Sequence, residues 1–308
     1  MKKKHHRYLV QIFFFLLISY IYIEMEISAG KNLIPILNEY AIQTISPIKG
    51  VEYFYNFITK ELTSKSFLLP SLIIMSTVCI LGIFFGPVLC GWVCPFGSMQ
   101  EFINGFGKKI FKDKYDNINP KLDKALRWLR IISLFVTIIA LYKQIKILDD
   151  FDPTQAMYSI FVQKYKIAGL VIFSLSLFLS LFIGRPYCRY LCPYGALVGF
   201  SNLIRIFTIR KNEENCSHCN KCNDVCPMKL HPEQRKQLRD VQCISCLECT
   251  SEQHCPHDKA LEFSMKCGKK THKMPFSVLF VIILGIVLSA ILITSTLAYW
   301  PFLKETLY

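Results

Sequence analysis

The chain has 308 residues, a formal net charge of +14 and 52% hydrophobic residues, which gather in long blocks flanked by basic residues. Blocks of this length exclude an ordinary soluble protein, and the basic residues beside them indicate contact with anionic lipid instead of nucleic acid. Fourteen cysteines in so long and apolar a chain exclude a small secreted scaffold built on disulfides.

Five hydrophobic blocks are candidate membrane spans, because each approaches the roughly 20 residues that a helix needs to cross a bilayer. They cover about residues 8–27, 67–89, 126–148, 167–183 and 276–298. No cleavage site of small residues follows the first block, so we expect a retained signal anchor. The third block carries Arg127 and Arg130 at one end and Lys143 and Lys146 at the other, and it crosses only if these side chains extend their charged ends outward to water. The pattern predicts an α-helical polytopic membrane protein with about five spans.

The distribution of Lys and Arg predicts the orientation of these spans. Basic residues are concentrated in the N-terminal tail and in residues 108–124, 185–211 and 266–273. With five spans, all four segments lie on one side of the membrane, which is therefore the cytoplasmic side. Lysines between positions 143 and 166 oppose this arrangement but are fewer. We expect a multi-pass protein of the cytoplasmic (inner) membrane, with its cysteine-rich segment in the cytoplasm.

A sequence repeat links two regions that each follow a span. Residues 86–97 match residues 184–195 at a spacing of 98 positions, and both contain the motif Cys-x3-Cys-Pro. The four motif cysteines are Cys90, Cys94, Cys188 and Cys192. The repeat predicts two helical hairpins related by a pseudo-twofold axis along the membrane normal.

The spacing of the motif cysteines indicates a shared site at the membrane surface. Positions i and i+4 of a helix lie on one face, so each motif should present both sulfurs in one direction. Pro95 and Pro193 should then disrupt the helices where they leave the membrane. Three roles stay open: a further metal cluster, a transition-metal site, or a pair that cycles between thiol and disulfide. Close packing of helices alone does not explain why the flanking residues repeat as well.

The strongest signal lies between residues 216 and 256, where eight cysteines form two runs that each end in Cys-Pro. The first run has the spacing of two-cluster bacterial ferredoxins, in which the fourth cysteine binds the other cluster. This logic predicts one [4Fe–4S] cluster on Cys216, Cys219, Cys222 and Cys255, and a second on Cys243, Cys246, Cys249 and Cys226. In the second run five residues precede the last cysteine instead of three, an insertion that a loop can absorb.

Zinc is the main alternative for these eight cysteines, with His218, His254 or His257 as further ligands. Zinc binding does not need the Cys-Pro endings, so iron–sulfur clusters are the better interpretation. We interpret Cys79 as a small buried hydrophobic residue and assign nothing to Cys267. No catalytic residue is predicted, since the sequence contains no phosphate-binding loop, zinc-protease histidine pair or nucleophile elbow.

These patterns divide the chain into three parts. Residues 1–210 form a membrane domain with the two Cys-x3-Cys-Pro repeats. Residues 211–262 form an inserted two-cluster ferredoxin-like segment of α+β class. Residues 263–308 supply a linker and a C-terminal transmembrane helix.

The combination of the two motifs with a two-cluster ferredoxin segment resembles the NapH/NosR/CcoG group of membrane polyferredoxins, over roughly residues 67–260. The motifs at residues 90–95 and 188–193 look most like those of NapH. The resemblance implies the membrane component of a quinol dehydrogenase, which oxidises quinol and feeds a partner, typically towards a periplasmic reductase. Residues 28–66 are too short for the flavin-binding domain of NosR, and we expect no soluble C-terminal domain like that of CcoG.

We therefore expect an iron–sulfur electron-transfer protein of anaerobic respiration, in a nitrate or nitrous oxide reduction system. Its expected partners are membrane lipid, the quinol pool and another iron–sulfur or cytochrome protein. Two other classes stay open: a copper reductase or assembly factor that uses the four motif cysteines, and a membrane redox sensor. The predicted orientation leaves one difficulty, since cytoplasmic clusters and a periplasmic reductase lie on opposite sides of the bilayer.

Overall fold

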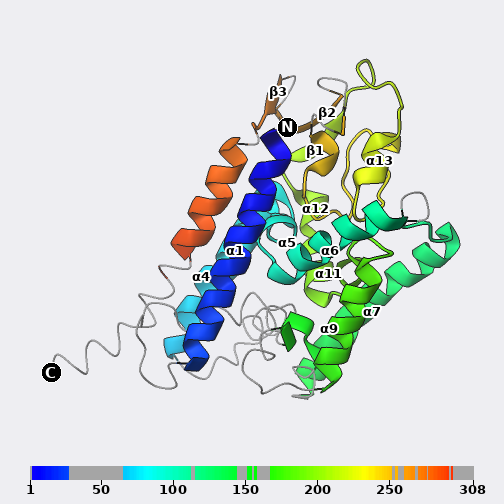
Figure 1. The fold of residues 1–308 in the computed structure, drawn as a ribbon. Coiled ribbons are helices and arrows are strands. Elements are labelled where there is room, and N and C mark those ends of the chain that lie inside the picture. The colour runs from blue at the N-terminus through cyan, green and yellow to red at the C-terminus, as the bar shows by residue number, and fades with distance from the viewer. Residues whose placement is uncertain are drawn as a thin grey trace.

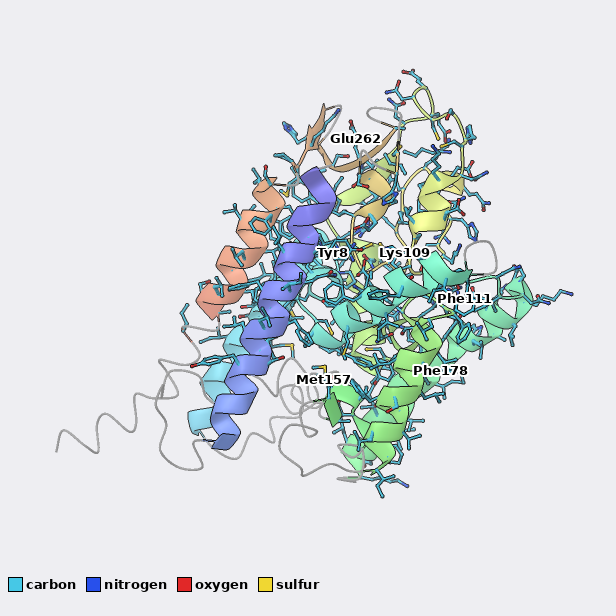
Figure 2. The ribbon with its side chains drawn as sticks, viewed as in Figure 1. Tyr8, Lys109, Phe111, Met157, Phe178 and Glu262 are labelled. Carbon is cyan, nitrogen blue, oxygen red and sulfur yellow. The ribbon has the colours of Figure 1, made fainter. Side chains whose placement is uncertain are left out.

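The computed structural model describes residues 2–27, 65–111, 115–143, 151–154, 156–157, 167–251, 254–255, 260–267, 270–275, 277–290 and 293. Long helices occupy one end of the molecule, and a small sheet with the cysteine-rich segment covers the other end (Figure 1). Phe178 on a long helix and Glu262 on a strand mark these two ends (Figure 2).

Helices make up most of the described chain. They are α1 (Lys2–Ile27), α4 (Lys65–Phe85), α5 (Val88–Trp92), α6 (Pro95–Phe111), α7 (Pro120–Tyr142), α9 (Ile167–Ser180), α10 (Pro186–Tyr190), α11 (Pro193–Gly199) and α12 (Ser201–Ile204). A further apolar helix, Ser277–Ala290, follows the sheet. Pro95, Pro120, Pro186 and Pro193 each occupy a first helical position, where the missing N–H leaves no intrahelical hydrogen bond unmade.

Helix contacts repeat between the two halves of the helical part. α1 packs against α5 and α6 as α7 packs against α10 and α11, and α4 packs against α5 as α9 packs against α10. The halves also exchange contacts, because α6 of the first half packs on α9, and α12 of the second half packs on α4. α5 and α10 begin 98 residues apart, the spacing of the sequence repeat. Reciprocal contacts of this kind support the pseudo-twofold relation of the two hairpins.

One described helix, α7, is long and apolar enough to cross a membrane by its length and composition. Shorter apolar helical stretches lie at Arg7–Tyr20, Met75–Phe85, Ile167–Ser180 and Ser277–Ala290, within or overlapping the other expected spans. The count of five spans therefore stays a prediction. α7 begins six residues earlier than expected for the third span, because Pro120 starts the helix and the Asn119 side chain accepts a hydrogen bond from the Lys121 N–H (3.0 Å).

The arginines of α7 do not extend to water as the sequence predicted. Arg130 is 3% exposed and lies against Gly195 of α11. Arg127 bonds the carboxylate of Asp123 (2.7 Å) and the carbonyl oxygen of Met228 (2.8 Å). The sequence considered outward extension as the one way for a membrane helix to carry these charges, and this condition was wrong, because tertiary contacts, which a sequence window cannot contain, surround both arginines within the protein.

The cysteine-rich segment lies between strands of a three-stranded antiparallel sheet. β1 (Thr208–Lys211) pairs with β2 (Leu261–Cys267), which pairs with β3 (Lys270–Lys273). Between β1 and β2 lie α13 (Lys221–Val225) and two 3-10 helices, η3 (Pro232–Gln234) and η4 (Glu248–Thr250). α13 packs against η4, which brings the two cysteine runs together. A ferredoxin-like α+β segment within a mostly helical protein is thereby confirmed.

The hydrophobic core continues from the helices into the cysteine-rich segment. Phe14 of α1, Trp92 of α5, Ile244 of the second cysteine run and Phe263 of β2 belong to one buried cluster. The rings of Phe85 and Phe263 lie 6.4 Å apart across the junction. The helices and the cysteine-rich segment therefore pack against each other through side chains and not only through a linker.

Candidate metal centres

Four of the predicted cysteine ligands surround α13. Burial raises the pKa of Cys222 to about 11, and the neighbouring thiols of Cys255, Cys216 and Cys219 contribute to the rise. Cys222 is buried whereas Cys219 is exposed, so this group lies at the edge of the protein. We call these four residues the Cys222 set; they are the four that the sequence predicts for one cluster.

The other four predicted ligands form a more deeply buried group around η4. Burial raises the pKa of Cys249 well above its usual range, and the thiols of Cys246, Cys226 and Cys243 add to the rise. The thiol of Cys222 also interacts with Cys249, so the two groups are neighbours. We call Cys226, Cys243, Cys246 and Cys249 the Cys249 set.

The two Cys-x2-Cys-x2-Cys loops share one backbone conformation. His218 and Asn220 in the first loop, and Ser245 and Leu247 at the matching positions of the second, all have φ between 50° and 60°. Residues other than glycine rarely adopt this left-handed conformation, because it costs energy. Left-handed residues within such loops turn successive backbone N–H groups inward, which forms an anion-binding hollow of the kind found at iron–sulfur sites.

The Cys-x3-Cys-Pro motifs do not lie on continuous helices. α5 ends at Trp92 and α6 begins at Pro95, so Cys94 lies at the break. In the second motif Cys192 caps α11, and its Sγ accepts a hydrogen bond from the Gly195 N–H (3.2 Å). The expectation of two sulfurs on one helix face was therefore wrong. Each proline starts a new helix instead of ending the old one, and the preceding cysteine occupies the turn between them.

The four motif cysteines nevertheless converge in one buried group. The thiols of Cys94 and Cys188 add to the effect of burial, which raises the pKa of Cys90 to about 12. The thiol of Cys192 interacts in turn with those of Cys188 and Cys90. The Gln100 Nε2 donates a hydrogen bond to the Sγ of Cys188 (3.7 Å), and Arg130 and Arg185 are the nearby cations. We call Cys90, Cys94, Cys188 and Cys192 the Cys90 set.

The Cys249 set lies directly on these motifs. Gly91 lies so close to the second cysteine loop that a Cβ at its position would be 2.6 Å from the carbonyl oxygen of Ile244. The indole Nε1–H of Trp92 donates a hydrogen bond to the carbonyl oxygen of Ser245 (3.1 Å). Gly184 makes the same kind of close approach to the Cys-Pro end of the first run. Only glycine allows backbones to come this near, which explains its presence in both motif regions.

A buried ion network joins α1, α6 and the Cys249 set. Arg7 pairs with Glu101 and with Glu248, and Arg185 pairs with Glu101 as well. Gln11 Nε2 donates a further hydrogen bond to the Glu101 carboxylate (3.1 Å). Burial opposes the ionisation of Glu101, but the two guanidinium groups outweigh it and lower its pKa to about 2. The sequence placed Arg7 in an exposed basic tail, and the structure corrects this, since Arg7 is 1% exposed.

Comparison with known proteins agrees with this arrangement. A family model described as a 4Fe-4S binding domain matches the chain twice, at residues 67–112 and 165–211, and each match contains one Cys-x3-Cys-Pro motif. YccM of Escherichia coli, named as an electron transport protein, is 29% identical over 80% of this chain and 70% of its own length. A protein of Methanocaldococcus jannaschii is 30% identical over 63% of this chain and 79% of its own length.

The ferredoxin-type protein NapH of Escherichia coli is 22% identical over 53% of this chain and 57% of its own length, and proteins named NosR and NirI match as well. The chain belongs to the NapH/NosR-type polyferredoxin family. No solved structure is significantly similar to this polyferredoxin. Membership supports iron–sulfur clusters and membrane association, and the names of YccM and NapH support a role in electron transport.

The histidines and the two remaining cysteines that the sequence singled out lie outside the three cysteine sets. Among the described residues of the polyferredoxin, no three His, Cys, Asp or Glu side chains are arranged to hold a single metal ion, so each cysteine set brings thiols near one another without forming a mononuclear metal site. His218 pairs with Glu233 (2.6 Å) and His254 lies 3.4 Å from Glu248, while His257 lies outside the described residues. Cys79 is exposed on α4, which corrects its expected burial. The side chain of Cys267 also lies outside the described residues.

Proposed function

We propose that this polyferredoxin oxidises quinol and passes single electrons to a redox partner, in a respiratory reduction system of the nitrate or nitrous oxide type. The observation that carries the proposal is the packing of the two cysteine loops, which share a left-handed backbone conformation, against each other through α13 and η4 and onto the Cys-x3-Cys-Pro motifs. The proposed protein has five spans, with residues 211–262 on the cytoplasmic side of the inner membrane.

The residues of the Cys222 and Cys249 sets fit two [4Fe–4S] clusters. Each set supplies four thiols, the soft ligand that iron–sulfur chemistry needs, and each loop presents inward N–H groups suited to a negatively charged centre. When bound, each cluster exchanges one electron at a time. The protein keeps water from the Cys249 set by burying it between η4 and the Cys-x3-Cys-Pro motifs, whereas the Cys222 set stays open to a partner at the surface.

The surroundings of the Cys90 set favour a metal–thiolate centre over a disulfide. Arg130 is buried beside these thiols, and it is one of the cations that act on the Cys90 thiol. A buried guanidinium without a nearby negative charge is strongly destabilising. A disulfide is neutral, whereas four thiolates around a metal centre keep a net negative charge beside Arg130. We therefore propose that Cys90, Cys94, Cys188 and Cys192 hold a third centre.

The proposal is tested with full-length protein purified anaerobically and reconstituted in lipid vesicles. Addition of menaquinol or ubiquinol should bleach the visible absorbance of the clusters, and a soluble acceptor outside the vesicles should restore it repeatedly. Cys249→Ser should abolish this cycle, whereas Cys79→Ser, outside all three sets, should leave it intact. Clusters that dithionite reduces but neither quinol reduces would refute quinol oxidation.

The orientation is tested separately by joining a reporter that is active only in the periplasm after Lys211. We expect no reporter activity, because the proposed topology places this point in the cytoplasm. An active reporter would overturn the cytoplasmic location of the cysteine-rich segment.

A further inference from the structure

A basic pocket lies beside the N-terminal half of α7, away from the α1 side of the molecule. It has a volume of about 690 Å³ and is formed by α7, α11 and the loops that follow Cys226 and precede Cys243. Six cationic side chains line it: Lys124, Arg127, Arg130, Arg189, Lys229 and Arg235. Three aspartates are its only acidic lining residues among those described. We call this cavity the α7 pocket.

The carboxylates of the α7 pocket are already neutralised. Each pairs with an arginine: Asp123 with Arg127 (2.7 Å), Asp116 with Arg189 (3.0 Å) and Asp240 with Arg235 (2.9 Å). Among the described residues, Lys124, Lys229 and Arg130 take part in no ion pair. The pocket therefore keeps an excess of positive charge from Lys124 and Lys229, whereas the charge of Arg130 is also close to the thiols of the Cys90 set.

Arg130 adds hydrogen-bond donors without acceptors to the α7 pocket. Its side chain is almost completely buried, and its Nε and Nη1 donate no hydrogen bond. Unmade hydrogen bonds of a buried charged group are costly, so a missing acceptor is expected nearby. The N-terminus of α7, which begins at Pro120 on the pocket wall, adds the partial positive charge of a long helix. An anion with several acceptor oxygens could accept hydrogen bonds from Arg130 and interact favourably with the N-terminus of α7.

The position of the α7 pocket indicates what carries the anion. The outward face of α7 is apolar and open, with Trp128 61% and Phe135 60% exposed, as expected of a helix that faces lipid. The pocket lies at the basic end of the same helix, and Ile131 and the half-exposed Phe200 line it beside the cations. Cations next to an apolar wall suit a phospholipid, because its phosphate could contact the cations while its adjoining acyl chains contact the apolar residues.

We propose that the α7 pocket binds the phosphate group of an anionic phospholipid, with Lys124 and Lys229 as its principal charged contacts. Basic pockets between helices on the cytoplasmic side of a membrane are suited to such head groups. The acyl chains would lie along Ile131 and Phe200. This inference does not depend on electron transfer, since it requires only that α7 crosses the membrane.

The test measures lipid binding to the full-length, cluster-loaded protein in detergent. Phosphatidylglycerol, zwitterionic phosphatidylcholine and inorganic phosphate are added in separate titrations, and bound ligand is counted by native mass spectrometry. We expect phosphatidylglycerol to bind well above the other two. The double variant Lys124→Gln/Lys229→Gln should weaken that binding by about 10- to 30-fold, from roughly one charge contact for each lysine.

A matched variant, Lys121→Gln/Lys143→Gln, removes two exposed charges from α7 outside the pocket and should change the affinity less than twofold. Unchanged visible spectra and melting temperatures without lipid would show that both variants fold. Equal binding of the two lipids, or no effect of the pocket variant, would overturn the proposal. If inorganic phosphate bound as tightly as phosphatidylglycerol, the lipid assignment would also fall.

Discussion

Replacement of Glu101 by Gln should strongly destabilise the junction between the helices and the Cys249 set. The Glu101 carboxylate pairs with both Arg7 and Arg185, and its pKa falls from an ordinary 4.5 to about 2 although burial opposes ionisation. A shift of this size corresponds to about 3 kcal/mol of stability at neutral pH. Glu101→Gln removes the charge, leaves the buried guanidinium of Arg185 without a carboxylate partner and leaves Arg7 paired with Glu248 alone. Loss of one partner of a buried ion pair typically costs about 3–5 kcal/mol.

The assay is denaturant unfolding of the anaerobically purified protein in detergent micelles at pH 7. Glu262→Gln is the matched control, because Glu262 pairs with the half-exposed Lys273 at the far end of the molecule (Figure 2). An exposed pair of this kind contributes about 0–1 kcal/mol. If Glu101→Gln lowers the free energy of unfolding no more than Glu262→Gln does, the buried ion network does not stabilise the junction.

The stability difference between the wild type and Glu101→Gln should depend on pH in a definite direction. The folded pKa of Glu101 lies below its unfolded value, so its contribution is complete above about pH 4.5 and is lost as the pH falls towards 2. The stability advantage of the wild type over Glu101→Gln should therefore shrink across this window. An advantage that stays constant down to pH 2 would contradict the charge-based explanation.

The remaining predictions concern the contact between the first motif and the second cysteine loop. Gly91→Ala should cost about 1–3 kcal/mol and lower the bound iron, because its Cβ would approach the carbonyl oxygen of Ile244 to 2.6 Å. Gly105→Ala is the control, since nothing lies within 4 Å of its Cβ position, and it should stabilise α6 by about 0.5–1 kcal/mol. Trp92→Phe removes the indole hydrogen bond to Ser245 and should cost about 1 kcal/mol in the same unfolding assay. Equal effects of the two alanine variants, or an unchanged Trp92→Phe, would contradict the proposed packing.

The features that the sequence predicted best are the cysteine loops and the repeated motifs, which depend on short spacings between residues. The cysteine runs predicted two sets of four, because each loop is local and its metal geometry is stereotyped. The structure places thiols of each set near one another, and their assignment as cluster ligands stays a prediction. The repeat predicted the convergence of the Cys90 set, since matched segments imply matched positions. The sequence predicted a break at Pro95 but placed Cys94 on the helix before it, whereas the structure places Cys94 in the turn between two helices, because a proline is compatible both with the end of one helix and with the start of the next.

Contacts between distant segments could not be predicted from the chain alone. Arg7 lies 94 residues from Glu101 and 241 from Glu248, and nothing local distinguishes it from the lysines beside it. Arg130 was likewise expected at the surface of a span, whereas it is buried against Gly195. A lone arginine at the end of an apolar block is compatible with either location, and only packing decides between them. Of the two glycines at these contacts only Gly184 carried a signal, since it recurs as Gly86 in the first repeat, whereas Gly91 corresponds to Arg189.

The most direct test of the account is the iron, zinc and acid-labile sulfide content of anaerobically purified full-length protein, with electron paramagnetic resonance after reduction. We expect about eight irons with matching sulfide for the Cys222 and Cys249 sets, and additional metal for the third centre proposed at the Cys90 set. Interacting spectra of two reduced clusters should disappear in Cys222→Ser and in Cys249→Ser. Protein that contains zinc and no acid-labile sulfide would contradict the account.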